Sequence, residues 1–187
     1  MAVNMKKMLA EALLELNVNK NLEQITIQNL LDHTGISRQT FYNHFKDKND
    51  LIQYIYEIYI IPDFGDSTKD INFEISMLHT LQKMKEYKIF LKQACMMEGQ
   101  NCLKEYMFKH CQEFDLKWHE YFYGSQLPDA LRFATIYHST ASTSMTLSWI
   151  LSDMVVGCEE MAHMITTMRS VGMDVLFDDG HRNPYKI

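Results

Sequence analysis

The chain has 187 residues, of which 47% are hydrophobic and 22% are charged, and this composition excludes a disordered or fibrous protein. Its formal net charge of -6 excludes a protein that covers nucleic acid with most of its surface. No stretch reaches the roughly 18 apolar residues of a membrane span, and no targeting segment stands out, so the sequence predicts a cytoplasmic protein without membrane contact.

The first part of the chain has the pattern of four helices. Apolar residues recur at spacings of three and four over residues 5–16, which is typical of one face of an amphipathic helix. Three further helices follow, and their expected N-terminal caps are Thr26, Ser37 and Asp47. Gly35 supplies the turn between the second and third helices. Residues 1–50 carry six Lys or Arg and six Asp or Glu, so the acidity of the chain lies in the remainder.

The rest of the chain predicts longer helices and no strand. IPDFGDSTKD, residues 61–70, combines Pro, Gly and Ser and is the best candidate for a boundary between domains. DDGHRNPYKI, residues 178–187, predicts a loose tail. The expected helices lie near 70–84, 87–96, 100–123, 129–156 and 159–171. The predicted fold class is therefore all-α.

The third helix, within GISRQTFYNHF, has two different faces. On a helical wheel of about 100° per residue, Phe41 and Phe45 share one side, and Gln39 and Asn43 lie on the opposite side. A helix that is buried on all sides in a core would not carry a polar face of this kind. The pattern predicts a helix-turn-helix, in which the second helix of the motif enters the DNA major groove. The alternative, a polar surface that only contacts solvent, stays open on spacing alone.

The side chains of this helix suit base recognition. Gln and Asn bond adenine in bidentate fashion, Arg bonds guanine, and the Thr40 methyl suits the thymine methyl. Tyr42 is expected to contact a phosphate, as are Lys48 and the helix N-termini behind the Thr26 and Asp47 caps. We therefore expect a helix-turn-helix DNA-binding domain over residues 1–50 and a helical regulatory and dimerisation domain over residues 51–187.

TIQNLLDHTGISRQTFYNHFKDKNDL, residues 26–51, resembles the N-terminal signature of the TetR family of transcriptional regulators. The second half, through FLKQACMMEGQNCLKEYMFKH and Trp149, is more weakly similar to regulators of the dihydroxyacetone-kinase type in that family. The resemblance implies a homodimeric, all-helical DNA-binding protein with a separate domain that senses a ligand or a partner. Leu31, Thr34 and Gln39 depart from the family pattern, so the operator cannot be taken from relatives.

The wheel, the caps and the resemblance together give the candidate DNA-binding residues. Their side chains or adjoining amides are expected to meet a palindromic operator of double-stranded DNA. These residues are Thr26, Ser37, Arg38, Gln39, Thr40, Tyr42, Asn43, His44 and Lys48.

The last two long helices are the candidates for the dimer interface. In the family that the sequence resembles, these helices of two chains pair into a four-helix bundle. Two recognition helices must also meet successive major grooves about 34 Å apart, which favours a homodimer. These helices mix small and large apolar residues, namely Ile136, Ala141, Met145, Trp149 and Val156, although an internal core explains any one of them nearly as well.

An apolar seam along residues 103–121 could line a ligand cavity, because such sites are mostly apolar with a few polar groups. An ordinary core stripe is the more common explanation for any one of these residues. The candidate pocket residues are Met107, His110, Cys111, Phe114, Trp118 and Trp149.

Enzymatic and metal-binding functions are not expected. His110 and Cys111 point about 100° apart on a helix, which is a poor arrangement for a nucleophile and its base. The chain contains no CxxC or HxxxH pair, and we expect no catalytic residue, metal or cofactor. The sequence predicts a regulator, in most cases of this kind a repressor, that responds to an unknown small-molecule effector. The alternative is a regulator or co-activator that depends on a partner protein and binds DNA weakly by itself.

Overall fold

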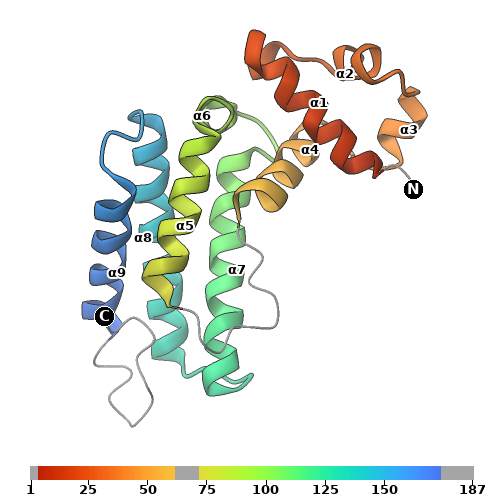
Figure 1. Cartoon of the computed structure of the whole chain (residues 1–187). Coiled ribbons are helices and arrows are strands. Elements are labelled where there is room, and N and C mark those ends of the chain that lie inside the picture. Colours follow the sequence, from red (N-terminus) through yellow and green to blue (C-terminus); the bar gives the residue numbers. More distant parts are fainter. Residues whose placement is uncertain (1–3, 62–71, 174–187) are drawn as a thin grey trace.

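The structure is a computed structural model, and it describes residues 4–61 and 72–173. Within those ranges every regular element is a helix, which confirms the predicted all-α class (Figure 1). The predicted boundary lies outside the described residues except for Ile61, and so does the predicted tail at 178–187.

The first helices form a small unit at the upper right of Figure 1, which we call the head. Its first three α-helices are joined by short connections, and α4 leads away from them toward the rest of the molecule. The elements are α1 (Met5–Asn19), the 3₁₀ turn η1 (Leu22–Gln24), α2 (Ile27–Thr34), α3 (Arg38–Tyr42) and α4 (Lys48–Ile55). A π-helical turn, η2 (Tyr56–Ile60), extends α4.

The remaining helices form what we call the body. Helix α7 packs against α8, and α5 packs against α9, so that the long helices run side by side (Figure 1). The elements are α5 (Phe73–Glu86), α6 (Lys88–Met96), α7 (Leu103–Tyr123), α8 (Asp129–Leu151) and α9 (Cys158–Met173).

Two helix boundaries differ from the sequence prediction for a local reason. Helix α8 ends at Leu151 and not near residue 156, because Asp153 and Met154 adopt left-handed φ values of 65° and 51°. Helix α7 begins at Leu103, since Gly99 and Asn101 also have positive φ values. Left-handed backbone cannot continue a right-handed helix, so both boundaries follow from local conformations that periodicity does not show.

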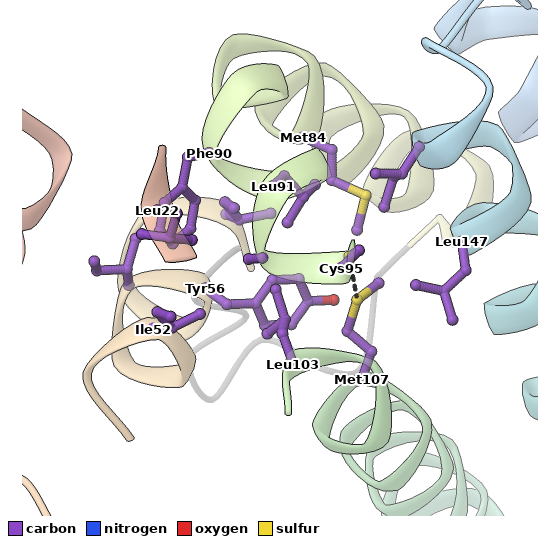
Figure 2. Packing of buried hydrophobic residues seen from close by; sticks show 14 of the residues in the cluster. Leu22, Ile52, Tyr56, Met84, Phe90, Leu91, Cys95, Leu103, Met107 and Leu147 are labelled. Carbon is purple, nitrogen blue, oxygen red and sulfur yellow. Dashed lines mark hydrogen bonds between the residues drawn. The ribbon is translucent and has the colours of Figure 1, made fainter. Parts of the chain in front are cut away.

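One hydrophobic core joins the head to the body (Figure 2). Leu22 from η1 and Ile52 from α4 lie on the side of Phe90 and Leu91 from α6. The ring of Tyr56 is buried in this core, and its hydroxyl points away from Leu22, toward the side where Cys95 and Met107 lie (Figure 2). Helix α4 therefore crosses the predicted domain boundary after residue 50 and packs on both sides of it, and that division of the chain stays a prediction.

Candidate nucleic-acid interface and regulatory cavity

The turn between α2 and α3 presents α3 on the surface of the head. Gly35 ends α2 with a left-handed φ of 72°, a conformation that costs glycine little because it lacks Cβ. Ser37 then caps α3, and its Oγ accepts a hydrogen bond of 3.1 Å from the Thr40 amide. Phe41 and Phe45 anchor the inner side of the segment in the core, where both are buried. The opposite side of this five-residue helix is consequently turned outward.

The outward side carries the amides that the sequence singled out. Gln39 Nε2 donates to Asn43 Oδ1 over 2.9 Å, and both side chains are exposed. Arg38 Nη2 donates to Gln28 Oε1 of α2 over 3.1 Å, also at the surface. Exposed hydrogen bonds of this kind exchange readily with other partners, because their net contribution to stability is small. The arrangement therefore offers two amides and one guanidinium to a base edge or a phosphate.

Tyr42 lies at the rim of this surface. Its side chain is 47% exposed, and its ring meets Phe41 edge-on at a centroid distance of 5.4 Å. That contact fixes the ring while the phenol remains accessible to a phosphate oxygen. Thr40 and His44 are half-buried on the flanks of the same segment.

Thr26 caps α2 at the neighbouring helix N-terminus. Its Oγ1 accepts from the Asn29 amide at 3.2 Å, and Asn29 Oδ1 accepts from the Thr26 amide at 3.0 Å. This reciprocal capping box starts the helix that leads into the turn. Thr26 is itself exposed, so the side chain and the first amides of α2 are open to a phosphate.

Lys48 is placed differently from the other candidates. Its Nζ donates to the carbonyl oxygens of Leu22, Glu23 and Ile25 at 2.9, 3.1 and 2.8 Å. An ammonium has three donors, and all three are used here. Burial lowers the pKa of Lys48, and the Glu23 carboxylate opposes that change. Lys48 therefore connects the start of α4 to η1, and its predicted phosphate contact stays a prediction that the geometry does not favour.

Lys48→Met is expected to lower the free energy of unfolding by about 1–3 kcal/mol, since it leaves three carbonyls, two of them partly buried, without their donor. Chemical denaturation measures this change. Lys46→Met removes the same charge from an exposed side chain and is expected to change stability by less than about 0.5 kcal/mol. Equal, small effects of the two substitutions would show that the Lys48 hydrogen bonds do not support the head.

A cavity lies in the body beneath η2, between α5, α7, α8 and α9, with a volume of about 100 Å³. Five of the six candidate pocket residues line it, all from α7: Met107, His110, Cys111, Phe114 and Trp118. Trp149 does not line this cavity, and its place in a ligand pocket stays a prediction that this geometry does not favour. Its ring is buried elsewhere, and its Nε1 donates to the carbonyl of Val156 at 2.9 Å, where the chain turns after α8.

A buried ion pair forms the polar end of this cavity. Arg169 Nη1 lies 2.7 Å from Asp115 Oδ2, and both side chains are almost fully buried. Arg169 Nε also donates to Ser142 Oγ at 3.0 Å, and the guanidinium lies 4.7 Å from the ring centroid of Phe73. Burial raises the pKa of Asp115, and the Arg169 charge opposes this effect.

The other titratable groups of the cavity wall are uncharged. Burial lowers the pKa of His110, so its imidazole is neutral near pH 7, although Glu57 opposes the change. Burial raises the pKa of the Cys111 thiol, which keeps it protonated. A neutral imidazole beside a protonated thiol is a poor arrangement for nucleophilic catalysis.

Two further features are absent from the described residues. No group of three or more His, Cys, Asp or Glu side chains in residues 4–61 and 72–173 is arranged to hold a metal ion. Over the same part of the chain, no helix is both long and apolar enough to cross a membrane.

Two family models match the chain. The model of the tetR family of bacterial regulatory proteins matches residues 9–55, which contain the α2–α3 turn and its exposed face. A model described as the transcriptional regulator C-terminal region matches residues 72–170, which is more than half of the chain and contains most of the cavity wall.

One individual protein is similar in sequence to this chain. The chain is 23% identical over 123 residues to the HTH-type dhaKLM operon transcriptional activator DhaS of Lactococcus lactis, covering 60% of this chain and 66% of that protein, which is just under two thirds of its length.

Two solved structures share the fold, although identities of 19% and 17% support nothing finer. A dihydroxyacetone kinase operon activator DhaS superposes with a TM-score of 0.68 over 93% of this chain and 98% of that one. A putative TetR-family transcriptional regulator from Syntrophomonas wolfei superposes with a TM-score of 0.64 over 90% of this chain and 94% of that one. The two matched models identify the chain as a member of the TetR family of transcriptional regulators, which are not enzymes.

Proposed function

We propose that the protein binds a palindromic DNA operator as a homodimer through the exposed side of α3, and that a ligand in the body cavity controls this binding. The observation that supports this proposal is the outward side of α3, where Gln39, Asn43 and Arg38 are held at the surface by buried Phe41 and Phe45. Amides and a guanidinium are the groups that recognise base edges in the major groove.

The second copy of the chain fits an apolar surface on the last two helices. Helices α8 and α9 expose several large apolar side chains, in contrast to the polar outside expected of a monomer. These residues are Phe133, Tyr137 and Met145 from α8 and Met164, Met168 and Val171 from α9. Of the residues proposed from the sequence, Ala141 and Met145 are exposed on this side, Ile136 and Val156 are half-buried, and Trp149 is buried. A dimer is the occupant that DNA binding needs, because two α3 helices must reach successive major grooves.

The double substitution Met145→Glu and Met168→Glu is expected to convert the dimer to monomers, since it places a carboxylate on each helix of the proposed interface. The two side chains are 59% and 66% exposed, so the folded monomer tolerates the change. Sedimentation velocity measures the mass. Ile89→Glu on α6 is a matched control, because Ile89 is 68% exposed outside α8 and α9. A double variant that still sediments as a dimer would place the interface elsewhere.

The route from cavity to DNA runs through η2 and α4. Tyr56 lines the cavity and belongs to the helix that connects body and head. Two amides of α4 also bond the turn before α7, Asn49 to the Gln100 carbonyl at 3.0 Å and Gln53 to the Asn101 carbonyl at 2.7 Å. A ligand that prefers one position of Tyr56 shifts the spacing of the two α3 helices by selecting one of two dimer geometries.

The sign of regulation has two candidates. Repression is the prediction from the sequence, and it requires only that the bound dimer blocks access to the operator. Activation is the second candidate, favoured by the likeness to an operon activator. A promoter reporter in a host with and without the gene distinguishes them, since loss of a repressor raises expression and loss of an activator lowers it.

The proposed function is tested by selecting duplex DNA from a random pool with the full-length protein at near-physiological salt. We expect an enriched palindrome whose half-sites are about one helical turn apart. A folded dimer that enriches no sequence would contradict DNA binding by the protein alone and would favour a regulator that depends on a partner protein.

A further inference from the structure

The charges around the cavity disfavour a charged ligand. Arg169 is engaged by the Asp115 carboxylate, the Ser142 hydroxyl and the face of Phe73. An anionic ligand would bring a second negative charge beside Asp115, and a cationic ligand would bring a second positive charge beside Arg169. Like charges in a buried setting are strongly unfavourable, and His110 supplies no compensating charge because burial keeps it neutral.

The shape and lining of the cavity favour a small, flat ligand. Phe73 and Trp118 stack at a centroid distance of 6.0 Å with an angle of 20° between their planes, and both rings belong to the wall. Tyr56 and Phe114 add two more rings, and Met107 adds an adaptable thioether. The volume of about 100 Å³ is of the same order as the roughly 150 Å³ of an engineered apolar cavity that binds benzene.

One buried hydroxyl of the cavity wall has no good hydrogen-bond partner among the described residues. Thr143 is 3% exposed and lies on the cavity wall, and its Oγ1 meets no strong partner among the described residues. The Cys111 thiol beside it is only a weak hydrogen-bonding group. A buried hydroxyl without a good partner costs free energy, and a ligand that supplies one recovers it.

We propose that this cavity binds an uncharged aromatic hydroxyl compound of the phenol class, with its ring among Phe73, Phe114 and Trp118 and its hydroxyl bonded to Thr143. The inference rests on the proposed function for its regulatory meaning, because it names the ligand class of the cavity that controls DNA binding. Asp115 also lines the wall, and its carboxylate can accept a second hydrogen bond in addition to its contact with Arg169.

The test uses calorimetric titration of the full-length protein with four probes of similar size: phenol, toluene, benzoate and benzylammonium. We expect phenol to bind about tenfold or more tightly than toluene, as one recovered hydrogen bond predicts, and the two ions not to bind. Thr143→Val removes the hydroxyl while keeping the shape and is expected to bring phenol to the affinity of toluene. Thr167→Val is the matched control, because Thr167 also has a buried hydroxyl without a hydrogen-bond partner among the described residues but does not line the cavity.

Several results would overturn the inference: no probe bound at millimolar concentration, benzoate or benzylammonium bound most tightly, toluene equal to phenol, or an equal loss in both threonine variants. Should Thr143→Val fail to fold, the ranking of the four probes on the unmodified protein still decides. The same preparation is used for DNA selection. Phenol binding without DNA enrichment contradicts the proposed function alone, and DNA enrichment without phenol binding contradicts the ligand class alone.

Discussion

Arg38→Ala is expected to lower affinity for the selected operator between ~30-fold and ~10⁴-fold. A good bidentate contact between arginine and guanine contributes about 1–3 kcal/mol of discrimination, and a symmetric dimer loses it in both half-sites. The substitution costs the fold little, because Arg38 is exposed and its bond to Gln28 lies at the surface. Fluorescence anisotropy with a labelled duplex measures the change.

Lys109→Ala is the control for the loss of one positive charge per chain. Lys109 is exposed on α7 and forms a long contact of 3.9 Å with Glu113. It is expected to change operator affinity by less than about threefold, since a distant surface charge is screened by salt. If Arg38→Ala and Lys109→Ala weakened binding to the same small extent, Arg38 would contribute only general charge and no base recognition.

Asp115→Asn is expected to lower the free energy of unfolding by about 3–5 kcal/mol, because it leaves the buried Arg169 without its countercharge. Urea denaturation followed by circular dichroism measures this loss. Glu113→Gln on the same helix is the matched control. Its ion pair with Lys109 is exposed, and we expect a change of less than about 1 kcal/mol.

The double substitution Asp115→Leu and Arg169→Met tests the effect of removing both charges of the ion pair together. Replacing both charges by apolar groups of similar size is expected to recover most of the stability lost in Asp115→Asn, since neither partner remains buried and unpaired. Recovery would show that the pair is kept for the polarity of the cavity and not for stability. A double variant as unstable as the single one would instead show that the ion pair supports the packing of α7 on α9.

The head was largely predictable because its pattern is local. About 100° per residue places Phe41 and Phe45 opposite Gln39 and Asn43, and the structure buries the first two and exposes the second two. Lys48 was not predictable in the same way. Its ammonium bonds the carbonyls of Leu22, Glu23 and Ile25, which lie more than twenty residues earlier in the chain, and no spacing rule shows such a contact.

The cavity was predictable only along one helix. The seam of α7 supplies Met107, Phe114 and Trp118 to the wall, as the apolar spacing indicated. The polar end joins Asp115 of α7 to Arg169 of α9, and both helices carry other charged residues, so the sequence does not single out this pair. Which two charges meet depends on how the helices pack.

The most direct test of DNA recognition by α3 is to repeat the selection of random duplex DNA with Gln39→Ala beside the unmodified protein. Gln39 is exposed at the centre of the proposed interface, so the variant keeps its fold. We expect the same palindrome with one position in each half-site losing its base preference, while the others remain. An unchanged preference at every position, obtained with a folded variant, would contradict base recognition by the exposed side of α3.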